Sequence, residues 1–361
     1  MSLLVTICGR DLLQDCNRST YDDRSLTRQH VVPSCFRLAP GKSFIPGGRC
    51  IRLCVAPTLQ ASPATCQEAQ IARMRVRAPG PLLVQFICTQ APASPPPLTL
   101  QPTRFSAERL ADERGVFVVS GGSRGLGLQF CRSLLEGSKG SVIALSRVPH
   151  RSDGLRAVGE DFPGRLRTIS VDLTSEESIR QAATAAASMC DHVDILVNCA
   201  GILHDNSFMP ERSLAACNAE WMHRVYALNA VAPVLLTAAF VPLLSGTPTS
   251  RPRIVANLSA RVGSVSDNRL GGWWSYRMSK AALNMATRNM AIELKRKRVL
   301  ALALHPGTSD TGLSKPFQKN VKPEKLFTTE FAVESMLKII HSAEDEHSGH
   351  LFAWDGQLIP F

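Results

Sequence analysis

The sequence predicts an α/β protein with one doubly wound parallel β-sheet that is covered by helices on both faces. Three observations predict this class. Short apolar runs of strand length alternate with helical patterns from about residue 113 onward. The strand runs are apolar almost throughout, as expected of a sheet buried on both faces. A glycine-rich turn joins the first strand run to the first helical pattern.

The expected strands are separated by stretches of which most are long enough for a crossover helix. They cover residues 115–120, 141–146, 166–171, 193–198, 253–258, 300–304 and 350–353. Helical spacing of apolar residues predicts helices over 124–136 and 175–189. Thr174 and Ser175 are candidates for the N-terminal cap of the second helix.

The first 110 residues differ from the rest of the chain in composition and show no sustained period. They hold seven of the 11 cysteines, 12 of the 23 prolines and most of the net charge of +11. We therefore expect a basic extension of low order over 1–110 and one folded domain over 111–361. The small net charge of the domain predicts no nucleic-acid partner.

The composition of the extension has three interpretations. Its arginines, serines and few acids are compatible with an organelle transit peptide, and a disordered tail or a wrongly assigned start would read the same. The expected location is therefore the cytoplasm, or the mitochondrion or chloroplast if a transit peptide is present. Its cysteines include no CxxC pair, so we expect no metal site, while a disulfide framework stays open.

Residues 225–244 are 20 consecutive apolar-rich residues without a charge. Twenty such residues could cross a bilayer by length alone. The segment contains Asn229, Pro233 and Pro242 and lies between the fourth and fifth expected strands. A span at this place would split the sheet, so we predict a helix buried against the sheet or in a subunit interface, and no stable membrane span.

Residues 120–127, SGGSRGLG, form the glycine-rich turn between the first strand and the first helix. Glycine permits the sharp turn and a close backbone approach, and the N-terminus of the helix supplies N–H donors and a positive dipole to a pyrophosphate. The sequence therefore predicts a dinucleotide site here. Its expected contacts are Gly121, Ser123, Arg124, Gly125, Leu126 and Gly127.

Two arginines predict the type of dinucleotide. The second strand ends in Ser146 and Arg147, where an acidic residue would bind the ribose 2′-hydroxyl of NAD. Arg147 and Arg124 instead place two guanidinium groups near that position, which suits the 2′-phosphate of NADP. Ordinary surface arginines are the plain alternative, but their joint position favours NADP.

Tyr276 and Lys280 are four residues apart in a helical pattern, so both side chains are expected on one face. A phenol with a pKa near 10 is a weak acid–base group at neutral pH. An adjacent ammonium favours the phenolate and lowers that pKa, which suits the pair for exchanging a proton with a carbonyl oxygen. An exposed helix face is the alternative interpretation of this spacing.

The order of these motifs resembles the short-chain dehydrogenase/reductase family. The glycine turn has its GxxxGxG spacing, and YxxxK follows the fifth strand as in that family. Residues 198–201 (NCAG) resemble its NNAG motif, and residues 306–311 (PGTSDT) resemble its PGxxxT loop. The resemblance covers about 113–361. The residues around Tyr276 and the chain end narrow it to the C-factor/sniffer-like, carbonyl-reductase-like branch.

The resemblance implies a Rossmann-type fold and hydride transfer between a nicotinamide cofactor and a carbonyl carbon. It implies that Tyr276 is the general acid/base, that Lys280 lowers its pKa and binds the nicotinamide ribose, and that Asn229 holds a proton-relay water. The further cofactor contacts that it implies are Asp172, Leu173, Asn198, Ala200, Gly201, Tyr276, Lys280, Pro306, Gly307, Thr308 and Thr311.

The sequence departs from that family at the catalytic serine. When the segment is aligned on Gly263, Ala260 occupies the position of this serine. Ser259 should point to the other side if the strand continues. Ser264 lies in the following loop and is our candidate for the missing hydroxyl. Alternatively, Tyr276 polarises the carbonyl alone.

These motifs predict an NADP(H)-dependent oxidoreductase for a small carbonyl or alcohol substrate, in a chain that could form a homo-oligomer. The alternative is an NADP-binding signalling or regulatory protein with little turnover, which Ala260 keeps open. Residues 312–327 are the expected lid over the substrate. Trp273, Trp274 and Met278 are candidates for an apolar wall, or for core or interface residues.

Overall fold

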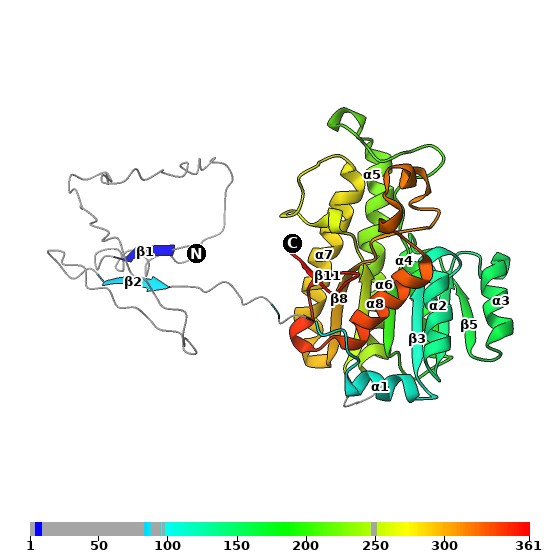
Figure 1. Cartoon of the computed structure of the whole chain (residues 1–361). Helices are drawn as coiled ribbons and strands as arrows, with labels where there is room; N and C mark the ends of the chain where they lie inside the picture. The colour runs from blue at the N-terminus through cyan, green and yellow to red at the C-terminus, as the bar shows by residue number, and fades with distance from the viewer. Residues whose placement is uncertain (1–3, 9–82, 88–94, 96–97, 247–250) are drawn as a thin grey trace, which may run out of the picture. The chain divides into compact units, whose positions relative to one another are not determined.

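The computed structural model describes residues 4–8, 83–87, 95, 98–246 and 251–361 (Figure 1). The chain divides into two compact units, Met1–Ser94 and Pro95–Phe361. In the first unit, β1 (Leu4–Cys8) pairs with β2 (Leu83–Ile87) in antiparallel orientation. The rest of the extension before Pro95 lies outside the described residues, and with it the transit-peptide and disulfide interpretations.

One eight-stranded sheet organises the second unit and confirms the predicted fold class. Its strand order is β12-β11-β8-β7-β6-β3-β4-β5, and every pair is parallel except β11 with β12. The strands are β3 (Val116–Ser120), β4 (Ser141–Ser146), β5 (Leu166–Ser170), β6 (Ile195–Asn198), β7 (Arg253–Leu258), β8 (Val299–His305), β11 (Leu351–Ala353) and β12 (Leu358–Ile359). The sequence had predicted all but β12, whose two residues are too short a signal for a pattern.

Helices cover both faces because alternate strand residues face opposite sides of the sheet. On β3, Phe117 and Val119 belong to one core, whereas Val116 and Val118 belong to the other. The first core includes residues of α2 (Gly125–Gly137), α3 (Asp153–Asp161) and α8 (Thr329–Ser342). The second includes residues of α4 (Glu176–Ala187), α6 (Ala232–Ser245) and α7 (Trp274–Leu294).

The long apolar segment forms part of this second core. A continuous helix runs over Ala219–Ser245, with α5 (Ala219–Tyr226) joined to α6 by one π-helical turn, Ala227–Val231. This helix is long and apolar enough to cross a membrane by length and composition alone. Leu236 and Phe240, however, are buried against the sheet. That packing agrees with the predicted buried helix.

A short helix precedes the first strand of the sheet. Helix α1 (Arg104–Ala111) lies at the end of the unit opposite the loops that flank α5 and α7 (Figure 1). Its Arg109 is 1% exposed and donates to the carbonyl of Pro252 at 2.6 Å, and Leu98 and Leu100 pack against the first core. The compact unit therefore begins at Pro95, upstream of the boundary at residue 111 that composition suggested.

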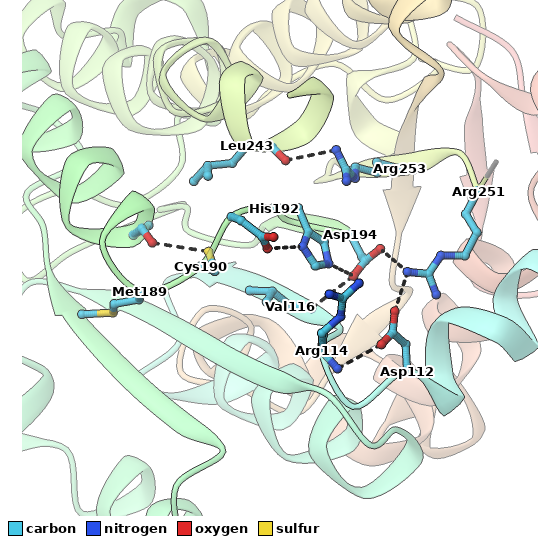
Figure 2. Close-up of polar contacts among 12 residues, drawn as sticks. Asp112, Arg114, Val116, Met189, Cys190, His192, Asp194, Leu243, Arg251 and Arg253 are labelled. Carbon is cyan, nitrogen blue, oxygen red and sulfur yellow. Dashed lines mark hydrogen bonds and ion pairs between the residues drawn. The ribbon is translucent and has the colours of Figure 1, made fainter. Parts of the chain in front are cut away.

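A buried ionic network lies beside α1, where the parallel strands begin (Figure 2). The Asp194 carboxylate lies 3.3 Å from Nε2 of His192 and 3.5 Å from Nη2 of Arg251, which also binds Asp112 at 2.7 Å. Burial raises the pKa of Asp194, but the hydrogen bond and charge of His192, the N–H of Val116 and the charge of Arg251 together leave that pKa below its usual range. The hydrogen bond to Asp194 raises the pKa of His192 in turn.

Candidate active site

The predicted site residues gather at the carboxyl ends of the central strands. The strand order reverses between β3 and β6, and such a switch point is where doubly wound sheets bind ligands. The Oγ of Ser120, at the end of β3, accepts hydrogen bonds from the N–H groups of Cys199 and Ala200 after β6. These bonds hold the two strand ends together and set the floor of the site.

The glycine turn is shaped so tightly that side chains are excluded. Gly121 and Gly125 have φ values of 71° and 54°, in the left-handed region that glycine adopts without strain. A Cβ on Gly127 would lie 2.1 Å from the carbonyl oxygen of Gly121. The first turn of α2 therefore starts directly over the end of β3. Its backbone N–H groups are thus available to an anion.

The loop after β8 closes the site from another side. Gly307 has a φ of 72°, and a Cβ there would lie 2.5 Å from the ring of Phe327. Thr311 approaches the glycine turn, because its Cγ2 lies 3.5 Å from the position of a Cβ on Gly125. The structure therefore brings the predicted PGxxxT segment against the predicted phosphate turn.

The groups expected to distinguish NADP from NAD lie in the glycine turn and after β4. Arg124 and Arg147 are both exposed, and Arg147 acts electrostatically on Asp172. The Oγ of Ser146 is buried and has no hydrogen-bond partner among the described residues. One oxygen of Asp172 accepts from the N–H and hydroxyl of Thr174, which lowers the pKa of this carboxyl. Its other oxygen accepts no hydrogen bond from the described residues.

Asn198 ties the central strands together beneath the site. Its Nδ2 donates to Oδ1 of Asn257 at 2.7 Å and to the hydroxyl of Thr237 at 3.1 Å. Its Oδ1 is buried without a partner among the described residues. The side chain therefore joins β6, β7 and α6, and Cys199 in the following position adds no hydrogen bond to that set.

Tyr276 and Lys280 lie on one face of α7, as predicted. The Nζ of Lys280 is 5.6 Å from the centroid of the Tyr276 ring and donates to the carbonyl of Leu258 at 2.6 Å. Burial lowers the pKa of Lys280 to about 8 and raises the pKa of Tyr276 above its ordinary value. This direction for Tyr276 is opposite to our prediction, because burial desolvates the phenolate.

Asn229 does not keep a free side chain for a relay. Its Oδ1 accepts from the N–H of Ile202, and its Nδ2 donates to the carbonyl of Ile202, both at 2.8 Å. Nδ2 also donates to the hydroxyl of Ser279, between Tyr276 and Lys280 in the chain. Asn229 therefore clamps the loop after β6 onto α7. It lies in the π-helical turn, a feature common at functional sites.

The hydroxyl of Ser264 is already used. It donates to the carbonyl of Pro360 and accepts from the N–H of Asp267 at 3.1 Å. Because its single proton is committed to Pro360, a bond to a substrate carbonyl would have to break that contact. This geometry favours a structural role for Ser264 over the catalytic role that we predicted. Ala260 is buried at the end of β7.

Glu211 is a residue of this region that sequence reasoning missed. Its buried carboxylate accepts hydrogen bonds from the N–H and the hydroxyl of Ser275, in the first turn of α7. Its carbonyl accepts from the N–H of Trp273 at 2.6 Å. An anion at a helix N-terminus is favourable. Glu211 lies 64 residues before Ser275, so no local pattern could have indicated the contact.

The fold and these side chains define a class. A doubly wound sheet with a glycine turn at its switch point, and a Tyr–Lys pair on the helix after the fifth parallel strand, is the arrangement of a nucleotide-dependent oxidoreductase. The family model of the short chain dehydrogenases matches residues 115–322. The chain therefore belongs to the short-chain dehydrogenase family.

Known proteins are similar to about half to 70% of the chain. An uncharacterized oxidoreductase of Schizosaccharomyces pombe is 29% identical over 262 residues, which are 70% of this chain and all of that protein. The C-signal protein of Myxococcus xanthus is 34% identical over 47% of this chain and 93% of its own length. An NADPH-bound carbonyl reductase from chicken fatty liver has 30% identity and a TM-score of 0.61, over 69% of this chain and 99% of that one.

Proposed function

We propose that this protein is an NADP(H)-dependent oxidoreductase that interconverts a carbonyl and an alcohol, with Tyr276 as general acid/base. The observation that carries the proposal is the Tyr276–Lys280 pair on α7, with Nζ 5.6 Å from the phenol ring. The NADPH-bound carbonyl reductase among the similar structures supports the cofactor. The cofactor supplies the hydride when it is bound.

The residues of this chain would handle the proton. A raised pKa keeps Tyr276 protonated at neutral pH, which is the state needed to donate a proton to a carbonyl oxygen. Lys280 carries its charge below about pH 8 and would stabilise the phenolate left after the transfer. Asn229 and Ser279 hold this turn of α7 against the loop after β6.

The residues at the cofactor site fit NADP. The glycine turn leaves room only for backbone, which would bring N–H groups to the pyrophosphate. The buried hydroxyl of Ser146, without a partner among the described residues, lies beside Arg147. A 2′-phosphate offers acceptors to both, whereas the 2′-hydroxyl of NAD would leave the guanidinium charge unused.

We expect NADPH to bind more tightly than NADH, and Arg147→Ala to remove most of the preference. Loss of one charge-assisted contact costs about 1.5–3 kcal/mol, or roughly 10- to 150-fold in affinity. Fluorescence titration of both cofactors against each variant measures it. Arg151→Ala is the matched control, since this exposed arginine follows in the next short helix. Equal affinities of the native protein for the two cofactors would refute the assignment.

A regulatory protein of the same fold with little turnover is the second candidate. Ala260, where the family has its serine, and the similarity to C-signal favour it. Oxidation of NADPH in the presence of a panel of aldehydes and ketones separates the candidates. Tight cofactor binding without turnover on any carbonyl would support the regulatory protein.

We also propose that the chain assembles with a second copy through α7. Met278, Met285 and Ile292 are exposed and follow one another at seven-residue intervals, so they form one stripe along this helix. Val231 and Val234 on the adjoining long helix are exposed as well. Exposed apolar side chains gathered along packed helices are typical of an interface, and a symmetric pair of copies would cover both stripes.

Ile292→Lys is expected to convert a dimer into a monomer, because it buries a charge in that interface. Sedimentation velocity of the full-length chain measures the oligomeric state. Leu270→Lys is the control, because Leu270 is 90% exposed and lies in a loop outside the stripe. A native protein that sediments as a monomer at all concentrations would contradict the proposal.

A further inference from the structure

Trp273 has an unusual backbone for a large residue. Its φ of 51° and ψ of 43° are left-handed, and Gly271 and Gly272 before it also have positive φ values of 63° and 64°. Glycine adopts this conformation freely, but a bulky side chain does so only at a cost. Residues held in such strain concentrate at functional sites. A third glycine would fit this backbone without strain, so a functional reason for tryptophan at this position is expected.

Contacts from distant segments hold Trp273 in this conformation. Its N–H donates to the carbonyl of Glu211. The carboxylate of Glu211 accepts from the N–H and the hydroxyl of Ser275, two residues further on at the start of α7. Arg277 donates to the carbonyls of Gly271 and Gly272. The left-handed turn is therefore held from both sides, which fixes the direction in which the indole leaves the backbone.

The indole lies between the proposed acid and the expected lid. Its ring centroid is 6.3 Å from that of Tyr276, edge to face, and 5.0 Å from that of Phe317 in the short helix Lys315–Asn320. His204 donates through Nε2 to the carbonyls of Gly312 and Leu313 at 3.2 Å, which holds this segment in place. The rings of Trp273, Tyr276 and Phe317 are only half-buried, so part of their surface stays open.

We propose that Trp273 is a specificity-determining residue that selects carbonyl substrates with a flat, apolar group on the carbonyl carbon. A flat ring can stack on the indole and Phe317 while its carbonyl oxygen reaches the Tyr276 hydroxyl. The sequence had grouped Trp273, Trp274 and Met278 as candidates for one apolar wall, and the structure gives them different surroundings. Trp274 has its indole Nε1 buried, and Met278 is 48% exposed on the stripe along α7. The inference rests on the proposed function for its kinetic test.

The test compares benzaldehyde with acetaldehyde in the full-length chain. Trp273→Gly is expected to lower kcat/KM for benzaldehyde about tenfold or more, through KM, and to change acetaldehyde less than about twofold. Cyclohexanecarbaldehyde, which is as large but not flat, should follow acetaldehyde. Trp273→Phe should restore most of the benzaldehyde activity. The melting temperature of Trp273→Gly should stay close to native, because glycine adopts the left-handed backbone without strain.

Arg298→Gly is the matched control, since Arg298 also has a left-handed backbone, with a φ of 56°, but ends the segment that follows α7. It should leave the aldehyde preference unchanged. An equal loss for benzaldehyde and acetaldehyde in Trp273→Gly would overturn the inference and make Trp273 structural. Binding of benzyl alcohol, followed by saturation-transfer NMR, tests the site without turnover. Weaker binding to Trp273→Gly supports the inference even if no aldehyde is reduced, and equal binding overturns it.

Discussion

Tyr276→Phe is expected to lower the turnover of carbonyl reduction by about 10²–10⁴ while cofactor affinity stays unchanged. The substitution removes only the phenolic hydroxyl, and this group is the proposed proton donor. Steady-state oxidation of NADPH and a cofactor titration measure the two quantities. Tyr226→Phe is the matched control, because Tyr226 is an exposed tyrosine at the end of α5. Unchanged turnover of Tyr276→Phe would refute the assignment.

The same assay should show which group sets the pH dependence. The pKa of Lys280 is lowered to about 8, so its ammonium is present below this pH and is lost above it. Turnover in the reductive direction should therefore fall as the pH rises through about 8. The raised pKa of Tyr276 keeps the phenol protonated throughout this range. In Lys280→Met, turnover should be low and should no longer change near pH 8.

Substitutions at positions 260 and 264 test which residue, if either, supplies the hydroxyl of the family serine. Ser264→Ala removes the donor to Pro360 and should lower the melting temperature with little effect on turnover. Ala260→Ser restores the hydroxyl at the position of the family serine and should raise turnover, by up to about 10²–10³ if it stabilises the developing charge as an oxyanion donor does. A large loss of turnover in Ser264→Ala at unchanged stability would instead return the catalytic role to Ser264.

Arg109→Ala is expected to cost about 3–5 kcal/mol of unfolding free energy, because it breaks a buried charge network from one side. Arg109 donates to the carbonyl of Pro252 and the hydroxyl of Ser106, and it interacts electrostatically with buried Asp194. Removing the cation leaves this carboxylate less compensated. Urea unfolding of the full-length chain measures the change, and exposed Arg114, at the same end of the sheet, supplies the control Arg114→Ala. A loss below about 0.5 kcal/mol would show that α1 contributes little.

The network around Asp194 also makes the stability of the fold depend on pH. The lowered pKa of Asp194 means that its contribution to stability is present above the ordinary Asp range and is lost as the pH falls through its folded pKa. The raised pKa of His192 has the opposite sign, so its contribution is present below about pH 6.5 and is lost as the pH rises through the folded value. The contribution of this network to stability should therefore be greatest at mildly acidic pH. Asp194→Asn should flatten this profile.

Two N-terminally shortened chains test whether residues 95–111 contribute to the stability of the folded unit. A chain that begins at Pro95 keeps α1, whereas one that begins at Asp112 loses Leu98, Leu100 and Arg109 together. The unfolding free energy of the second chain should be lower than that of the first by at least the amount lost in Arg109→Ala. Equal stability would restore the boundary that composition suggested. The comparison depends only on residues 95–111, because both chains lack 1–94.

Local patterns were enough for the sheet and the cofactor turn. Apolar runs identify strands wherever they lie in the chain, because burial on both faces requires them. The spacing of Gly121, Gly125 and Gly127 predicted a turn whose close contacts the structure bears out. Helix α1 escaped notice because its face is polar, with Ser106 and Arg109 as its buried residues. Its burial comes from polar contacts, which have no hydrophobic period.

The sequence by itself determined the fold class, the order of the strands along the chain, the tight glycine turn and the shared face of Tyr276 and Lys280. Each of these follows from residue type and short-range spacing. Only the tertiary structure decided the direction of the Tyr276 pKa, the commitment of Ser264 to Pro360, and the clamp of Glu211 on α7. Desolvation and hydrogen-bond partners depend on which distant segments pack around a side chain, and spacing along the chain carries no record of that.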